Sequence, residues 1–207
     1  MMGGKLGTIF ARAGHEVIFS YARSEQKLKT LARNAKSNAR HGTPREAAQE
    51  VDAALLAVHW SRVDDVLKKA GDLSGKPVIT CSLPMNDDNT GLVIGHTLSG
   101  AEELQRKISK AYVVAAFNTV PSEVLFGVYE GRRRVGRPSL VYCGDHAAGK
   151  DIAAELIRDS GFEPVDAGPL RIARYIEPFA LLIGELAYGG AGGPELAYRF
   201  ERFGQRD

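Results

Sequence analysis

Residues 1–27 decide the fold of this chain and read MMGGKLGTIFARAGHEVIFSYARSEQK. Apolar side chains recur at three- and four-residue spacing in the first half of this stretch, which predicts an amphipathic helix. They are Leu6, Ile9, Phe10 and Ala13. Gly14 is expected to end the helix in a left-handed conformation, and residues 15–21 predict the strand that follows. A glycine-rich helix start followed by a strand is typical of the second half of a dinucleotide-binding unit.

The first half of that unit is missing. In the fingerprint G-x-G-x-x-G a strand delivers the first two glycines, and Gly3 would be the third, with Met1 and Met2 before it. The absent strand lies mid-sheet in such folds, so its loss leaves a slot and removes about five buried apolar residues, at ~1.5–3 kcal/mol each. Either the natural chain begins upstream of Met1, or the protein is a degraded form that binds no dinucleotide. The intact motifs downstream favour the first explanation.

The end of the expected strand 15–21 indicates which dinucleotide binds. An NAD site places an Asp or Glu there for the ribose 2′-hydroxyl, whereas an NADP site needs cations and hydroxyls for the 2′-phosphate. No acidic residue lies between Val17 and Ser24, and the available donors are Ser20, Arg23, Ser24 and Lys27. Arginine can bind a phosphate through two hydrogen bonds, whereas a carboxylate would repel it. These residues predict NADP as the cofactor, with a solvated polar turn as the alternative.

Strands and helices alternate along the remainder of the chain. The expected strands cover residues 51–58, 77–83, 112–117, 137–145 and 162–166. The expected helices cover residues 25–36, 61–70, 100–107 and 147–160, with one more starting at Thr43, N-caps at Ser61 and Asp145, and a loop at 38–42. The alternation predicts an α/β fold, a Rossmann-type doubly wound parallel sheet that lacks its first strand, over residues 1–168.

Residues 169–207 are expected to form a small C-terminal helical cap. From Ile172 to Tyr188 nearly every helical face is apolar. Such a helix is buried in its own domain or against another subunit, so a homodimer is one expectation. Pro178 marks either a kink or the true start of this helix. A short second helix is expected to carry Leu196, Phe200 and Phe203.

The composition argues against several classes of partner. The net charge is +2 and no run of one sign indicates binding to nucleic acid or to an anionic membrane. No apolar run has the length of a membrane span. Cys81 and Cys143 lie in apolar strand-like runs, which predicts buried reduced thiols and a cytoplasmic setting. No metal site is expected.

Six short motifs occur in order along the chain. They are GHEVIFS at 14–20 with Arg23 and Ser24 after it, AVHW at 57–60, SLP at 82–84, AFNTVP at 116–121, VYCGD at 141–145 and DAGPL at 166–170. As an ordered set they resemble the NADPH-dependent coenzyme F420 reductases (F420 is a 5-deazaflavin) and the wider family of NADP oxidoreductases related to them. Each motif is weak alone, and the set is more specific for the family than for its substrate.

The resemblance implies a role for each matching position. The 2′-phosphate would be held by Ser20, Arg23, Ser24 and Lys27. The ribose and pyrophosphate would lie beside Val58, His59 and Trp60, and the nicotinamide near Asn118, Thr119 and Pro121, with the C-terminal helices closing the pocket of the second substrate. The chain departs from the family pattern in the longer turn at Tyr21 and Ala22 and in the missing first strand.

The implied reaction is hydride transfer between NADPH and a deazaflavin or flavin-like ring. Because the cofactors carry that chemistry, no catalytic acid or base is nominated. A histidine at a strand end is more often a hydrogen-bonded residue of the pocket wall than a proton donor or acceptor, so His59 is interpreted as a wall residue. Trp60 is interpreted as part of the pocket wall or of the core. Two alternatives stay open: an NADP-dependent reductase of an imine, a carbonyl compound, a flavin or ferric iron, and a non-catalytic NADP(H)-binding protein.

Overall fold

The computed structural model describes residues 2–22, 24–36, 38–133 and 135–204. The helices are α1 (Met2–Ala13), α2 (Glu25–Ala35), α3 (Pro44–Glu50), α4 (Val63–Ala70), α5 (Gly100–Lys107), α6 (Leu125–Glu130), α7 (Ala147–Asp159) and α8 (Ala173–Gly184). The strands are β1 (Val17–Phe19), β2 (Ala39–His41), β3 (Ala54–Leu56), β4 (Pro77–Thr80), β5 (Tyr112–Ala115), β6 (Ser139–Gly144) and β7 (Glu163–Asp166). Short helical turns complete the set: η1 (Trp60–Arg62), η2 (Leu170–Ile172) and the π-helix η3 (Glu185–Gly189). None of these helices is long and apolar enough to cross a membrane.

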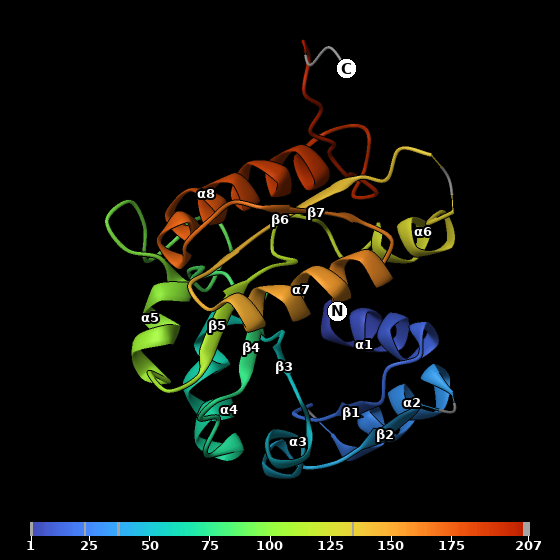
Figure 1. The fold of residues 1–207 in the computed structure, drawn as a ribbon, viewed down its shortest axis with the longest axis vertical. Coiled ribbons are helices and arrows are strands. Elements are labelled where there is room, and N and C mark those ends of the chain that lie inside the picture. Colours follow the sequence, from blue (N-terminus) through green and yellow to red (C-terminus); the bar gives the residue numbers. More distant parts are fainter. Residues whose placement is uncertain (1, 23, 37, 134, 205–207) are drawn as a thin grey trace.

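The strands form two separate sheets (Figure 1). One contains β1 and β2, and the other has the order β3-β4-β5-β6-β7. All neighbouring strands are parallel except β5 and β6, which are antiparallel. The α/β class and the doubly wound arrangement are therefore confirmed, and the two sheets are parallel apart from this one pair.

The antiparallel pair follows from the connection between β5 and β6. A parallel neighbour needs a crossover that returns the chain to the other end of the sheet. The connection holds one helix, α6, whose six residues span about 9 Å. The chain re-enters the sheet beside the end at which it left, since the Tyr198 hydroxyl contacts both Thr119 after β5 and Val141 in β6.

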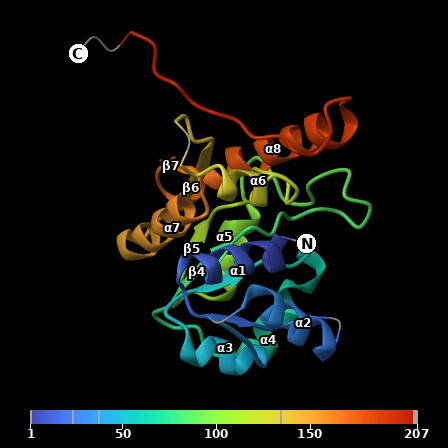
Figure 2. The same ribbon diagram turned by 90° about the vertical axis from the view of Figure 1, so that its right-hand side faces the viewer.

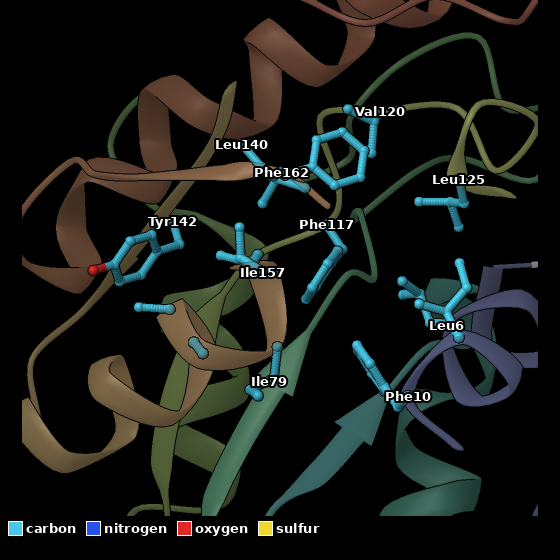
Figure 3. Close-up of a cluster of buried hydrophobic side chains, with 14 of the residues drawn as sticks. Leu6, Phe10, Ile79, Phe117, Val120, Leu125, Leu140, Tyr142, Ile157 and Phe162 are labelled. Atoms are coloured by element: carbon cyan, nitrogen blue, oxygen red, sulfur yellow. The ribbon is translucent and has the colours of Figure 1, made fainter. Parts of the chain in front are cut away.

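Helices cover both faces of the large sheet. On one face, α1, α6 and α7 contribute to a core cluster with Ile79 and Phe117. Phe117 packs edge-to-face on Phe10 with the ring centroids 6.0 Å apart, and Ile157 of α7 lies beside it (Figure 3). A second cluster contains residues of α4, α5 and α8. Figure 2 shows α1 in front of the large sheet, beside α2, which it contacts.

Several local expectations are confirmed. The helix at residues 100–107 has the expected bounds, and Thr43 forms a capping box with Glu46. Gly14 ends α1 with a φ of 111°. Of the two expected buried thiols, Cys143 is buried, which raises the pKa of its thiol to about 12, whereas Cys81 is half-buried.

Other local expectations are wrong. The expected loop at 38–42 contains β2, a three-residue edge strand whose register pairs Val17 with Ala39. Helix α6 was not predicted from the sequence. Pro178 lies inside α8 and does not mark its start.

The expected N-caps at Ser61 and Asp145 are also wrong, because both side chains make other hydrogen bonds. The Ser61 hydroxyl is 3.0 Å from Nδ1 of His59, and His59 caps η1. Asp145 Oδ1 accepts a hydrogen bond from the Leu170 backbone N–H at 2.9 Å. Helix α7 instead has His146 at its N-cap position, with no side-chain hydrogen bond.

Residues 195–203 are extended, not helical. The Ser139 backbone N–H donates to the Tyr198 carbonyl at 2.8 Å, and the Phe200 N–H donates to the Ser139 hydroxyl at 2.9 Å. These contacts with β6 take backbone groups that a helix would need for its own hydrogen bonds. The expected short helix around Leu196, Phe200 and Phe203 is therefore wrong.

Candidate dinucleotide site

Two glycines let α1 lie close to the strands. A Cβ added at Gly3 would lie 3.0 Å from the Cβ of Ala57, directly after β3. A Cβ added at Gly7 would lie 2.4 Å from Cε1 of Phe19 in β1, a distance that side chains do not tolerate. The first two turns of α1 therefore rest on residues at the carboxyl ends of β1 and β3. This is the edge of an α/β sheet at which ligands bind.

A large cleft lies between β1 and β3, under α1. Its volume is about 1330 Å³, and its lining is mostly apolar. Four residues expected in the site meet in this lining: Gly3, Ser20, Lys27 and Val58. The polar members Ser20 and Lys27 come from the end of β1 and from α2. The structure thus brings one end of the expected phosphate clamp to the rim of a cleft.

The expected clamp follows β1 and runs into α2. Ser24 is the N-cap of α2, and its hydroxyl accepts a hydrogen bond from the Lys27 backbone N–H at 3.3 Å. Ser20 is half-buried and Ser24 is exposed. The N-terminus of an eleven-residue helix adds a partial positive charge to this segment. Arg23, the central residue of the expected clamp, lies outside the described residues.

Tyr21 also belongs to this rim, although the sequence indicated only that it lengthens the turn after Ser20. It has a positive φ of 56°, and its hydroxyl donates to Oδ2 of Asp65 at 2.6 Å. Lys69 binds the same carboxylate oxygen at 2.8 Å and lies over the Tyr21 ring. The hydrogen bond from Lys69, ahead of that from Tyr21, lowers the pKa of Asp65. The acid that α4 brings near the clamp is thus already paired with a cation.

The residues after β3 form a hydrogen-bonded wall. Nδ1 of His59 lies 3.0 Å from the Ser61 hydroxyl, and Nε2 lies 3.0 Å from Oδ1 of Asn89. Both ring nitrogens therefore have protein partners, which favours the interpretation of His59 as a wall residue. Trp60 packs against the second core cluster, as expected of a wall or core side chain. Ser82 donates to the Val58 carbonyl at 2.7 Å and holds the end of β3 in place.

The residues after β5 are buried and strained. Phe117 is fully buried and has a φ of 63°, a conformation that costs free energy for a residue with a Cβ. Asn118 follows it, is 9% exposed and carries an Oδ1 atom that is buried without a hydrogen-bond partner. An unpaired buried acceptor costs about 1–3 kcal/mol. Strain and an unpaired polar atom at one strand end are typical of a binding site.

The C-terminal segment closes over this strand end through Tyr198. Its hydroxyl lies 2.7 Å from the Thr119 hydroxyl and accepts a hydrogen bond from the Val141 N–H at 3.1 Å. The ring packs edge-to-face on Phe179 of α8 at 5.1 Å. Desolvation on burial raises the pKa of Tyr198. No local sequence signal identifies this contact, because it joins residues 79 positions apart.

The expected site residues fall into three groups. Gly3, Ser20, Lys27 and Val58 line the cleft, whereas Asn118 and Thr119 are buried at the end of β5. Ser24, His59 and Trp60 lie next to the first group in the chain but outside the lining of the cleft. All of them follow a strand of the fold or begin a helix at the same sheet edge, as expected for a dinucleotide site.

Together, the fold and this edge define a class of protein, the doubly wound α/β proteins with a dinucleotide site at the carboxyl ends of their strands. The model of the family described as NADP oxidoreductase coenzyme F420-dependent matches residues 1–84. This match confirms the resemblance that the six motifs indicate. The expected class of enzyme, an NADP-dependent oxidoreductase, is that of the matched family.

One curated relative and two solved structures are similar to this chain. Metalloreductase STEAP3 from Rattus norvegicus is 30% identical over 137 residues, which are 66% of this chain and 26% of the relative. The chain thus spans about a quarter of the length of that relative. A candidate F420-dependent NADP reductase from Arthrobacter sp. FB24 gives a TM-score of 0.83 at 23% identity, over 97% of this chain and 95% of that one.

A second solved structure shares the fold at lower similarity. The reductive aminase from Aspergillus terreus, in complex with NADPH and ethyl-5-oxohexanoate, gives a TM-score of 0.62 at 17% identity. The match covers 88% of this chain and 57% of that one. At these identities the two solved structures show the fold. NADP is the cofactor named in the description of the matched family and bound in the aminase structure.

Proposed function

We propose that the protein is an NADP(H)-dependent oxidoreductase that transfers hydride between NADPH and a deazaflavin such as coenzyme F420 or a flavin-like ring. The observation that carries the proposal is the end of β1, where Ser20 and Lys27 line the cleft and no acid occurs from Val17 to Ser24. Hydroxyl and cationic donors without a carboxylate suit a 2′-phosphate and disfavour NAD. The matched family supplies the class of acceptor.

The residues at the sheet edge fit the cofactor, since they offer donors at one end and an unpaired acceptor at the other. Ser20, Arg23, Ser24 and Lys27 would hold the 2′-phosphate. Asn118 Oδ1, buried without a partner, would accept a hydrogen bond from a carboxamide N–H. NADPH supplies the hydride when it is bound. The protein orients the ring, and the apolar core around Phe117 excludes water from it.

The experiment that tests this proposal is reduction of the deazaflavin by NADPH, followed by the absorbance of the deazaflavin ring. We expect hydride transfer with NADPH and much slower transfer with NADH at equal concentration. A protein that binds NADPH but reduces neither a deazaflavin nor a free flavin would refute the acceptor. Equal rates with both nicotinamide cofactors would refute the cofactor assignment.

The similarity to metalloreductase STEAP3 supports one alternative acceptor, ferric iron. A metalloreductase needs a carrier that passes single electrons, because NADPH gives up two electrons as hydride. Reduction of ferric chelates by NADPH only when a flavin is added would favour this alternative. Binding of NADPH without oxidation by any of these acceptors would favour a non-catalytic NADP(H)-binding protein.

Three broader features belong to the same proposal. Residues 1–168 would form the NADP-binding domain, and residues 169–207 would form the segment that closes the pocket of the second substrate. Tyr198 supports this division, because it joins the C-terminal segment to Thr119 at the expected nicotinamide position. Two copies of the chain would pair through the outer face of α8. The reaction would take place in the cytoplasm.

A further inference from the structure

Five arginines gather around one pocket at the far end of α1. They are Arg12, Arg132, Arg133, Arg137 and Arg158, and the pocket has a volume of about 650 Å³. Arg12 lies in the last turn of α1, Arg158 lies in the last turn of α7, and the other three belong to the connection between α6 and β6. Figure 1 shows α1, α6 and the end of α7 on one side of the molecule, and contacts join α1 to both other helices.

The pocket lies away from the expected dinucleotide site. That site is expected at the start of α1, where Gly3 rests on Ala57. Arg12 follows Gly3 by nine residues, which is ~14 Å along the helix axis at ~1.5 Å per residue. The function proposed above assigns no role to any of the five arginines.

The arginines of the pocket lack acidic partners. Within the described part of the chain, none of the five forms an ion pair, whereas four arginines elsewhere do: Arg40, Arg106, Arg174 and Arg199. Asp159, the acid in the pocket lining, lies 2.8 Å from Nε2 of His15 instead. Like charges repel, so this gathering of cations costs folding free energy, which a bound anion would recover.

Protein contacts hold three of the guanidinium groups in place. Nη1 of Arg132 donates to the Tyr129 carbonyl at 2.8 Å, and the group lies 4.0 Å from the centroid of the Tyr129 ring. Nε of Arg137 donates to the Arg132 carbonyl at 3.1 Å, and Arg12 lies over the Phe126 ring. A guanidinium has five N–H donors, so most of them remain for a ligand. Groups that are already positioned lose little conformational entropy on binding.

A glycine brings two of the arginine-bearing segments together. A Cβ added at Gly161 would lie 2.7 Å from the Val128 carbonyl oxygen and 3.1 Å from Cβ of Arg132. The Gly161 N–H donates to the carbonyl of Arg158 at 3.0 Å. The end of α7 is therefore packed against α6 and the connection that follows it, so close packing fixes this side of the pocket.

The charge of the pocket indicates the kind of anion that fits. A phosphate group carries about 1.5–2 negative charges and three acceptor oxygens, whereas a carboxylate carries one charge. Arginine binds phosphate through two parallel hydrogen bonds. Five cations around about 650 Å³ are therefore matched best by two or three linked phosphates. The whole chain has a net charge of only +2, so no long basic track extends from the pocket as nucleic acid would need.

We propose that this pocket binds a compact oligophosphate, a small molecule with two or three linked phosphate groups, at a site separate from the dinucleotide site. The guanidinium groups of α1, α7 and the connection between α6 and β6 surround the phosphates and neutralise them. This inference does not depend on which cofactor or acceptor the protein uses.

The test measures binding of inorganic triphosphate to the 207-residue chain by isothermal titration calorimetry. We expect one site per chain, with affinity that falls from triphosphate to pyrophosphate to phosphate. Arg133→Gln combined with Arg158→Gln should weaken triphosphate binding at least about tenfold, because charge-assisted hydrogen bonds are lost. Both side chains are exposed, so the melting temperature should change little.

Arg45→Gln combined with Arg106→Gln is the matched control. It removes the same charge from exposed arginines outside the pocket, so triphosphate affinity should stay within about twofold. Equal losses in the two double variants, or no binding at millimolar triphosphate, would overturn the proposal.

Further titrations separate this pocket from other anion sites. Arg23→Ala should leave triphosphate affinity unchanged, and a tenfold loss there would place the triphosphate at the expected 2′-phosphate clamp and overturn the proposal. Citrate or oligoglutamate that binds more tightly than triphosphate would contradict the phosphate assignment, and a tighter oligonucleotide would contradict the compact ligand. These titrations use neither NADPH nor an acceptor, so failure of the proposed function would not alter them.

Discussion

Asn118 shows most clearly how a single residue points to a site. Its Oδ1 atom is buried without a hydrogen-bond partner, and the residue before it, Phe117, has a positive φ. Both features cost folding free energy, and neither contributes to packing. They are consistent with a strand end shaped for a ligand and not for stability. The resemblance of AFNTVP to the family motif indicated the same position from the sequence.

The substitution Asn118→Leu tests this interpretation. We expect the melting temperature to stay the same or rise, because the change removes an unpaired buried oxygen. We also expect kcat/KM for NADPH-dependent reduction to fall roughly tenfold, because one hydrogen bond to the cofactor is lost. Thermal unfolding and steady-state kinetics on one preparation measure both. Ser160→Ala is the matched control: its buried hydroxyl donates to the Ile157 carbonyl, so stability should fall and activity should not.

The substitution Arg23→Ala tests the choice of NADP over NAD. A charge-assisted hydrogen bond contributes about 1.5–3 kcal/mol, so NADPH affinity should fall tenfold or more while NADH affinity stays nearly unchanged. Titration followed by nicotinamide fluorescence measures both affinities. Lys29→Ala is the control, because Lys29 is an exposed cation nearby that pairs with Glu25. Equal losses for NADPH and NADH would contradict the assignment of the clamp.

At the scale of elements, α8 is held to α5 by two carboxylates. Glu177 of α8 is 1% exposed and accepts hydrogen bonds from the Gly100 and Ala101 N–H groups at 2.8 and 3.0 Å. Glu102 binds Arg174 through two hydrogen bonds of 2.6 and 2.8 Å. The two hydrogen bonds to Glu177 satisfy backbone N–H groups at the start of α5 that have no partner within the helix. These contacts orient the C-terminal segment over the end of β5.

The titration of Glu177 should make stability depend on pH. Burial raises the pKa of Glu177 from 4.5 in the unfolded chain to about 7 in the folded protein. Between these values the folded state holds a proton that the unfolded state has released. The free energy of unfolding should therefore decrease as the pH rises from about 4.5 to 7, by at most about 1.4 kcal/mol per pH unit, and level off above 7.

Glu177→Gln provides the comparison. The amide oxygen of glutamine can still accept one hydrogen bond from the start of α5, but the side chain does not titrate. The difference in unfolding free energy between the two proteins, from urea denaturation at several pH values, should change between pH 4.5 and 7 and stay constant above 7. A difference that is constant over the whole range would refute the raised pKa.

At the scale of the whole molecule, α8 presents an apolar outer face. The inner face is buried in the chain through Ile176, Ala180 and Ile183. The outer face and η3 carry large apolar side chains that are more than half exposed: Tyr175, Leu182, Leu186 and Tyr188. Leu182 and Leu186 lie one helical turn apart, so they form a continuous surface. A second copy of this helix is the occupant that such a face suits in a homodimer.

We therefore expect a dimer at micromolar concentration that Leu182→Glu, combined with Leu186→Glu, converts to a monomer. A buried glutamate pair at a two-fold contact would have to lose its hydration without a partner. Light scattering coupled to size exclusion measures the mass of each protein. Val93→Glu is the control, because Val93 is 59% exposed and belongs to neither α8 nor η3. A monomeric parent protein would remove the dimer from the proposal.

Local signals in the sequence were enough to predict several elements of the fold. The helix expected at residues 100–107 has the bounds of α5, and Gly14 ends α1 where its lack of a Cβ permits a positive φ. The strand–helix alternation determined the α/β class. Each inference used residues within a few positions of one another, where the backbone geometry is set by propensity and caps.

Features that join distant residues became visible only in the folded protein. The extended chain at 194–204 and the Tyr198–Thr119 contact depend on groups that are 61 and 79 positions apart. The antiparallel β6 depends on the pairing of Gly144 with Val114. The bonds from Gly100 and Ala101 to Glu177 span 77 and 76 positions. No period or cap encodes such pairs, because their free energy comes from burial and hydrogen bonds that exist only when the whole chain is folded. The cleft between β1 and β3 also depends on residues that are distant in sequence, since its walls come from helices and strands along most of the chain.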